Sequence, residues 1–198
     1  MKRYLLVLKF FLKTKFIFKN PPQRDLVIFD DVSIFDLKNL IHHYNFFIMQ
    51  NRGKNIKKIY FFFKIFKHFF KNYKGNVMTS YLVSLLEIIN PRVVLTNIDN
   101  SYKFFELARA LNHKINFVAI QNTVRFELKE HEHRYERNLI QNDITKKFYI
   151  PNFLCFGQVE IDTYNYYKIN VENFYKVGSL RLANVLYHIK KNKIKLKE

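Results

Sequence analysis

Short apolar runs alternate with amphipathic stretches along most of this chain. The clearest unit spans residues 91–125, where the apolar run 93–95 is followed by a helical stripe and then by a second apolar run, 115–120. Two buried strands joined by one helix are expected to lie parallel in one sheet, with a right-handed crossover. The polar residues that follow both strands then lie at the same carboxyl edge, where open α/β sheets bind ligands.

The same alternation extends on both sides of this unit. Further strands are predicted at 25–30, 46–49, 152–156 and 174–177, and helices at 33–43, 56–73, 77–89, 159–167 and 182–198. The start of 56–73 also fits a short strand at 59–61, which would move the helix start to Phe62. Because no hairpin signals separate the strands, the pattern predicts an α/β fold with a Rossmann-like parallel sheet flanked by helices, within residues 21–187.

The predicted helix 56–73 separates lysines from aromatic side chains at spacings of three, four and seven. The basic side is predicted to carry Lys57, Lys64, Lys67, Lys71 and Lys74, and the other side Phe62, Phe63, Phe66, Phe69, Phe70 and Tyr73. Such a helix suits an anionic membrane surface, or single-stranded nucleic acid, or simple burial of its aromatics against the sheet. Nucleic acid is the least favoured of these partners, since no RNA-binding signature is present.

The net charge of +18 is concentrated in a few segments. Residues 1–24 and 51–76 contain no acid, and the C-terminal end carries its lysines against Glu198 alone. Residues 1–20 predict a basic amphipathic helix that rests on an anionic membrane or packs on the domain. Lysines interrupt its apolar run, which excludes a signal peptide and a spanning helix. Residues 188–198 are predicted to form a basic tail.

No catalytic signature accompanies these elements. The chain has no G-x-G-x-x-G, P-loop or G-x-S-x-G motif, and its one cysteine, Cys155, excludes an internal disulfide and favours a reducing compartment. His131, Glu132 and His133 offer no third metal ligand at a defined spacing, so a solvated charged segment is the preferred interpretation. We therefore expect no metal and no cofactor in this chain.

Several ordered segments carry a resemblance to a known family. They are PRVVLTNIDN, FVAIQN with Arg125 after it, CFG and YKVGSLR, preceded by a K-N-P and D-L-V-I-F-D run. Together they resemble the N-terminal domain of bacterial surface-carbohydrate biosynthesis proteins, which are related in layout to GT-B glycosyltransferases and CDP-glycerol glycerophosphotransferase-like capsule enzymes. The resemblance covers about residues 4–187. It departs at Thr123, where such proteins usually have glycine, a residue that tolerates a positive φ.

The resemblance implies an acceptor-side domain of a glycosyltransferase-like enzyme that builds capsule or lipopolysaccharide, peripheral on the cytoplasmic face of the membrane. Such enzymes hold a nucleotide-sugar mainly in a C-terminal domain, which would begin about where this chain stops. We therefore assign no catalytic residues, expect the domain to be inactive alone, and interpret 188–198 as a possible linker. The implied partners are an anionic membrane, a lipid-linked or sugar acceptor, and a C-terminal domain or partner chain.

The resemblance also implies a set of substrate-binding residues at the carboxyl edge of the sheet. They are Asp99, Asn100, Gln121, Asn122, Arg125, Gly178 and Ser179. Arg125 could bind a phosphate or carboxylate, and the amides could orient sugar hydroxyls. Asn100 and Asn122 fit turn formation equally well. The alternative function is a non-enzymatic basic α/β module that binds anionic membrane or nucleic acid.

Overall fold

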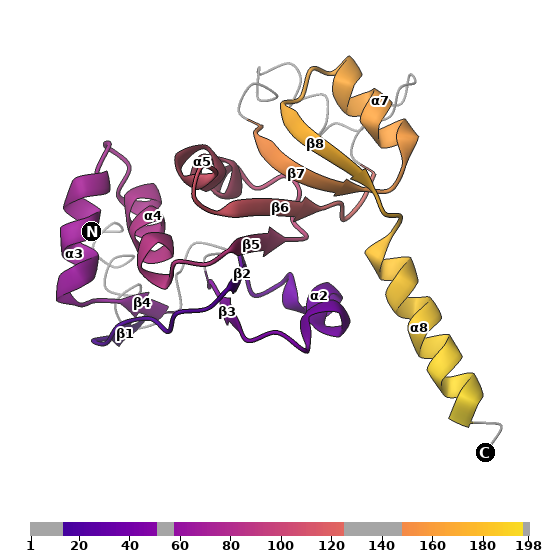
Figure 1. Cartoon of the computed structure of the whole chain (residues 1–198), viewed down its shortest axis with the longest axis horizontal. Coiled ribbons are helices and arrows are strands. Elements are labelled where there is room, and N and C mark those ends of the chain that lie inside the picture. The colour runs from indigo at the N-terminus through magenta and orange to yellow at the C-terminus, as the bar shows by residue number, and fades with distance from the viewer. Residues whose placement is uncertain (1–13, 51–57, 125–147, 196–198) are drawn as a thin grey trace, which may run out of the picture.

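The computed structural model describes residues 14–50, 58–124 and 148–195 (Figure 1). Six of its strands are β2 (Leu26–Ile28), β3 (Phe46–Ile48), β5 (Val93–Thr96), β6 (Asn116–Ile120), β7 (Ile150–Cys155) and β8 (Val171–Lys176). They form one sheet in the order β3-β2-β5-β6-β7-β8, and every neighbouring pair is parallel. The predicted Rossmann-like parallel sheet is therefore confirmed.

The strand order reverses once, between β2 and β5. There, Leu26 pairs with Val93 and Ile28 pairs with Leu95. The chain builds outward in one direction from β2 to β3, and in the other direction from β5 to β8. In open α/β sheets a crevice forms outside the carboxyl ends of the strands at such a switch point.

Helices cover both faces of this sheet. The described helices are α2 (Ile34–Ile41), α3 (Phe63–Asn72), α4 (Val77–Ile89), α5 (Tyr102–Leu111), α7 (Gln158–Tyr166) and α8 (Leu180–Lys195), of which α3 packs on α4. Alternate strand residues serve opposite faces. Val27, Val94 and Phe117 belong to the large core with α4, α5 and α7, whereas Ile28 and Leu95 belong to a smaller core with α2.

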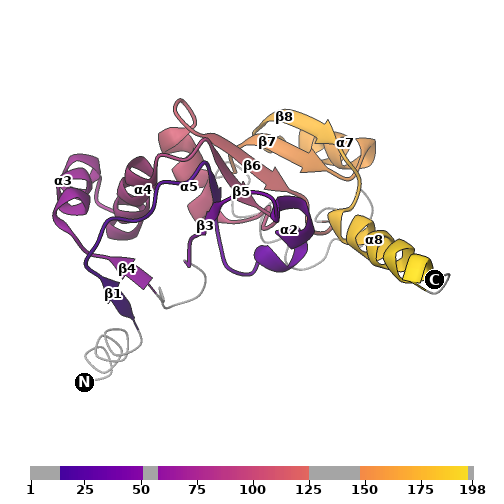
Figure 2. The same ribbon diagram turned by 60° about the horizontal axis from the view of Figure 1, so that its bottom comes forward.

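A second, two-stranded sheet lies beside α3 and α4 at one end of the molecule (Figures 1 and 2). It pairs β1 (Lys15–Ile17) with β4 (Lys58–Tyr60) in parallel. The predicted N-terminal helix 1–20 is therefore wrong throughout 14–20, where no residue is helical. Residues 15–17 satisfy their backbone by pairing with β4 and direct Phe16 into an apolar cavity. The rest of that prediction, at residues 1–13, lies outside the described residues.

Local signals in the sequence fix the ends of α4, the helix that leads into the central unit. Asn76 accepts a hydrogen bond from the backbone N–H of Thr79 at 3.1 Å, which caps its start. At the other end Asn90 takes a left-handed φ of 51° before Pro91, and its N–H donates to the carbonyl of Leu86 at 2.8 Å. Both caps agree with the boundaries predicted from sequence.

Two predicted boundaries differ from the structure near the C-terminus. β8 begins at Val171 instead of residue 174, because exposed polar residues such as Glu172 occupy the outer positions of this edge strand. α8 begins at Leu180, and Figure 1 shows it extending away from the domain. Its first turns attach to α2, where Asn184 Nδ2 donates to the carbonyl of Asp36 at 2.8 Å.

Candidate functional site

The substrate-binding residues predicted from sequence do follow the carboxyl ends of parallel strands. Asp99 is buried and Asn100 half-buried between β5 and α5, while Gln121 and Asn122 follow the neighbouring strand β6. Gly178 and Ser179 follow β8, which is two strands farther along the sheet. The first four positions are thus brought to adjacent strand ends and the last two are not. Arg125 lies outside the described residues.

Three of these positions have structural duties in the loops. Gln121 Nε2 donates to the carbonyl of Thr123 at 3.1 Å, and Gln121 Oε1 accepts from the N–H of Phe156 at 2.9 Å, so this amide ties β6 to the end of β7. Ser179 Oγ accepts the N–H of Leu182 at 3.3 Å and caps α8. Gly178 has a φ of +76°, which turns the chain from β8 into that helix.

The loop after β6 does not need the glycine that the family resemblance implies. Thr123 does not adopt a positive φ, and its carbonyl is held by the Gln121 amide. Asn122 Oδ1 is buried, and no donor among the described residues reaches it. A buried acceptor without a donor is costly unless a ligand or water supplies one, so Asn122 retains a potential binding role.

At the switch point, polar side chains that the sequence analysis did not select lie together between α2 and the end of β5. Asn97 Nδ2 donates to Asp36 Oδ2 at 2.5 Å, and the Asn97 N–H donates to Ser33 Oγ at 3.3 Å. Asn97 Oδ1 is buried and receives no hydrogen bond from the described part of the chain. Asp30 Oδ1 accepts the N–H of Ser33 at 3.0 Å, which places a carboxylate at the start of α2. The sequence signal that could have revealed these residues is that Ser33 and Asp36 lie in the segment that follows the buried strand β2.

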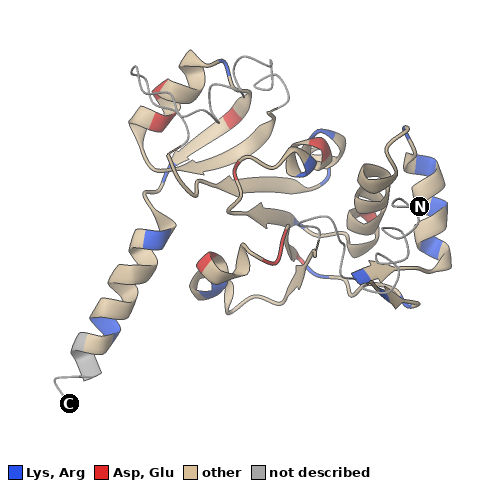
Figure 3. Cartoon of the chain, turned by 180° about the vertical axis from the view of Figure 1, so that it is seen from behind, with Lys and Arg blue, Asp and Glu red and all other residues tan. Residues whose placement is uncertain are grey.

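The most distinctive surface is the outer face of α3, which we call the basic face. Figure 3 shows several basic positions along this helix, at the end of the molecule away from α8. The basic face consists of the exposed residues Lys64, Lys67, Lys71 and Lys74 together with Phe63 and Phe70. The remaining predicted lysine, Lys57, lies outside the described residues.

The predicted separation of lysines from aromatics on α3 is wrong at two positions. Phe63 and Phe70 are 84 % and 74 % exposed and share the outer side of the helix with Lys67. The reason is the helical phase: positions 63, 67 and 70 lie on one side, whereas the inward side is centred on Ile65, the one buried residue of α3. The basic face therefore combines cations with two protruding phenyl rings.

Polar contacts hold α3 firmly on α4. Glu87 Oε2 accepts a hydrogen bond from Asn72 Nδ2 at 2.7 Å and lies 2.9 Å from His68 Nδ1. Burial opposes ionisation of Glu87, but the hydrogen bonds with His68 and Asn72 outweigh it and lower the pKa of the carboxyl. The basic face is thus presented on a helix that is anchored from behind.

An apolar cavity of about 340 Å³ lies directly behind the basic face. Its lining comes from β1, β4, α3 and α4: Phe16, Ile59, Tyr60, Phe61, Ile65, Phe66, Phe69, Val77, Met78 and Tyr81. The rings of Phe61 and Phe66 stack edge to face with centroids 4.7 Å apart. The size and apolar lining of this space suit an apolar group such as a hydrocarbon chain.

The described residues do not favour a membrane-spanning segment, a metal site or a cysteine nucleophile. None of their helices combines the length and the apolarity that crossing a bilayer requires. Within the same residues, no three histidine, cysteine or acidic side chains lie close enough to hold a metal ion, and His131–His133 fall outside them. Cys155 is buried, and burial raises the pKa of its thiol, which makes it a poor nucleophile.

The chain's own geometry therefore provides two candidate sites, the basic face with its apolar cavity and the polar cluster of Ser33, Asp36 and Asn97 at the switch point. Comparison with known proteins gave no match: the chain is similar to no family model, no curated protein and no solved structure.

Proposed function

We propose that this chain is a peripheral membrane protein of surface-polysaccharide biosynthesis, and that it binds the acceptor side of a glycosyl-transfer reaction at the cytoplasmic face of the membrane. The observation that carries the proposal is the basic face of α3, in which Phe63 and Phe70 protrude among four exposed lysines. Basic, Phe-rich helical faces suit the interface of anionic bilayers, where lysines lie at the level of the head groups and aromatic rings enter the acyl boundary.

The energetics favour a lipid surface over a role in the core. Each lysine near an anionic leaflet contributes about 1 kcal/mol, so the four lysines supply about 4 kcal/mol before the phenyl rings are counted. A helix that served only as a cover for the core would gain nothing from two phenylalanines facing water. Membrane binding gives both rings an apolar environment.

The apolar cavity supports the acceptor part of the proposal. A lipid-linked acceptor has a long hydrocarbon chain and a phosphate-bearing head, and the cavity and the lysines offer one partner for each. Sugar hydroxyls would bind at the carboxyl edge of the sheet, through groups such as the amide oxygens of Asn97 and Asn122. The resemblance of the ordered sequence segments supports the polysaccharide assignment, with the nucleotide-sugar held by a further domain or a partner chain.

Vesicle sedimentation tests the membrane part. The triple variant Lys64→Gln, Lys67→Gln and Lys71→Gln should bind phosphatidylglycerol-containing vesicles about a hundredfold more weakly than the wild type, at about 1 kcal/mol per lysine. The matched control changes three exposed lysines on other elements, Lys38, Lys168 and Lys176, to glutamine and lowers the net charge equally.

Only the first variant should lose binding, because the effect depends on position. Equal losses in both variants would show that total charge decides, and unchanged binding in the first would refute the proposal. Displacement of the protein from vesicles by single-stranded RNA at physiological salt would favour the nucleic-acid alternative. For the acceptor, geranyl phosphate should shift the methyl signal of Met78, which lines the apolar cavity.

A further inference from the structure

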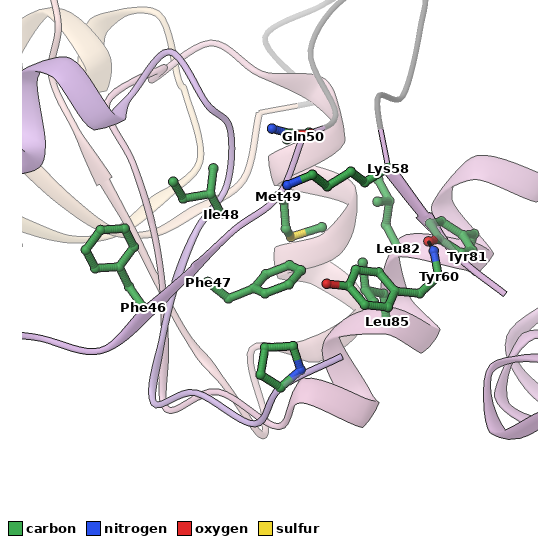
Figure 4. A pocket seen from close by; sticks show the side chains of 11 residues that line it. Phe46, Phe47, Ile48, Met49, Gln50, Lys58, Tyr60, Tyr81, Leu82 and Leu85 are labelled. Atoms are coloured by element: carbon green, nitrogen blue, oxygen red, sulfur yellow. Dashed lines mark hydrogen bonds between the residues drawn. The ribbon is translucent and has the colours of Figure 1, made fainter. Parts of the chain in front are cut away.

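A second cavity lies beside the edge of the main sheet and has a different character. Its volume is about 300 Å³, and Figure 4 shows it between β3, β4 and α4. Its lining residues are Pro22, Phe46, Phe47, Ile48, Met49, Gln50, Lys58, Tyr60, Tyr81, Leu82 and Leu85. This edge cavity is thus an apolar space bordered by a few polar side chains, which is the usual composition of a small-molecule site.

The polar side chains come from two different sheets and converge on this space. Figure 4 shows the Lys58 amine extending toward Gln50 and Met49, and the Tyr60 hydroxyl pointing toward Phe47. Gln50 follows β3 in the main sheet, whereas Lys58 and Tyr60 belong to β4 in the small sheet. Their meeting therefore depends on tertiary packing and not on a local turn.

Gln50 carries a buried acceptor that a bound molecule could satisfy. Its Oε1 is buried, and no donor among the described residues reaches it. A buried carboxamide oxygen without a donor costs free energy, and that cost disappears when a bound molecule supplies an N–H or O–H. Lys58 adds a positive charge on the same cavity wall, with no acidic residue among the lining residues to neutralise it there.

The edge cavity is walled off from the cavity behind the basic face by two tyrosines. Tyr60 and Tyr81 line both spaces, and the Tyr60 N–H donates to the Tyr81 hydroxyl at 2.9 Å. Burial raises the pKa of Tyr81 to about 12, so this hydroxyl stays neutral and the wall carries no charge. In the edge cavity, Lys58 therefore provides the positive charge, and Phe47, Met49 and Leu82 provide apolar contacts.

We propose that the edge cavity binds a small amphipathic carboxylate that also carries a hydrogen-bond donor, such as a hydroxylated aromatic acid. The carboxylate pairs with Lys58, the donor meets Gln50 Oε1, and the apolar body packs on the floor of the cavity. This site is distinct from the lipid-binding surface and does not depend on it.

Methionine methyl signals test the two cavities separately. The chain has three methionines; Met49 lines the edge cavity and Met78 lines the cavity behind the basic face. Titration of the full chain, labelled with ¹³C at the methionine methyl groups, with 4-hydroxyphenylacetate should move the Met49 signal to saturation and leave Met78 in place. The assignments follow from Met49→Leu and Met78→Leu.

Two analogues of this probe isolate its two polar groups on the unaltered protein. The methyl ester of 4-hydroxyphenylacetate, which removes the charge, should bind about tenfold more weakly, and phenylacetate, which lacks the hydroxyl donor, about fivefold. Lys58→Met should abolish the preference for 4-hydroxyphenylacetate over its methyl ester. Gln50→Leu should abolish the preference for 4-hydroxyphenylacetate over phenylacetate. Lys58→Arg should retain the first preference.

Two results of the titration would overturn the proposal. A Met49 signal that stays fixed up to millimolar probe, or moves equally with all three compounds, would show that the polar groups recognise nothing. A shift of Met78 alone would place the probe in the other cavity. Vesicle binding is tested with variants of the basic face, whereas probe binding is tested at the edge cavity. A negative result in either experiment therefore leaves the other interpretation unaffected.

Discussion

Removing the two exposed phenyl rings of the basic face distinguishes insertion of the rings into the lipid from attraction of the lysines to anionic head groups. Phe63 and Phe70 are 84 % and 74 % exposed, so nearly all of the apolar transfer free energy of both rings remains to be gained. Complete burial of a phenylalanine contributes about 1.5–3 kcal/mol. Half-immersed rings would together supply about 2 kcal/mol, and fully immersed rings about 4 kcal/mol.

The double variant Phe63→Ser and Phe70→Ser should therefore bind anionic vesicles about 30-fold to 1,000-fold more weakly, measured by sedimentation. Phe35→Ser is the matched control, since Phe35 lies on α2 and is also 84 % exposed. The free energy of unfolding should change by less than about 0.5 kcal/mol in either variant, because these rings contribute little to the core.

Salt distinguishes this effect from that of the lysines. Added salt should weaken binding of the wild type and the double variant alike, so that the ratio of their affinities persists, because apolar transfer is not screened. Wild-type affinity in the double variant, or an equal loss in Phe35→Ser, would show that the phenyl rings do not enter the lipid and would refute the reasoning.

Three further predictions concern stability and reactivity. Asp36→Ala removes the acceptor of the Asn97 amide and should lower the free energy of unfolding in urea by about 1–3 kcal/mol; a loss below about 0.5 kcal/mol would contradict the hydrogen bond. The lowered pKa of Glu87 means that its ionised form adds stability above the ordinary value of 4.5, and that this stability is lost as the pH falls through the folded value. Thermal melts should thus show a smaller acid-induced drop in Glu87→Gln than in the wild type. The buried Cys155 thiol should react with a disulfide reagent only on unfolding, and rapid labelling of the native chain would show that it is accessible.

The sheet could be predicted from sequence because its central elements carry their signals locally. The helix 77–89 has a cap at each end, and the runs around Val94 and Phe117 are strongly apolar and of strand length. Parallel pairing then follows from the alternation of strands and helices. By contrast, the segment 15–17 is too short to show whether it is a helix or a strand, and its partner β4 lies far along the chain.

The candidate sites were predictable only in part, for the same reason. Sequence placed polar residues at the carboxyl edge, but it could not show that the Gln121 side chain is used within its own loop. Spacings of three and four place Phe63, Lys67 and Phe70 on one side of any α-helix, so the sequence alone could have assigned both rings to the lysine side. Gln50 and Lys58 reach the edge cavity from separate sheets, and the hydrophobic periodicity of the sequence does not indicate that they lie close together.

The switch in strand order also determines when the chain can fold. β2 lies between β3 and β5, and its second neighbour is synthesised only after β4, α3 and α4. Until then the apolar strand Leu26–Ile28 has one open edge, which can pair with another chain. Long-range parallel pairing of this kind slows folding and prolongs exposure of aggregation-prone edges. A nascent chain should therefore be most vulnerable to aggregation in the interval between the emergence of β3 and that of β5.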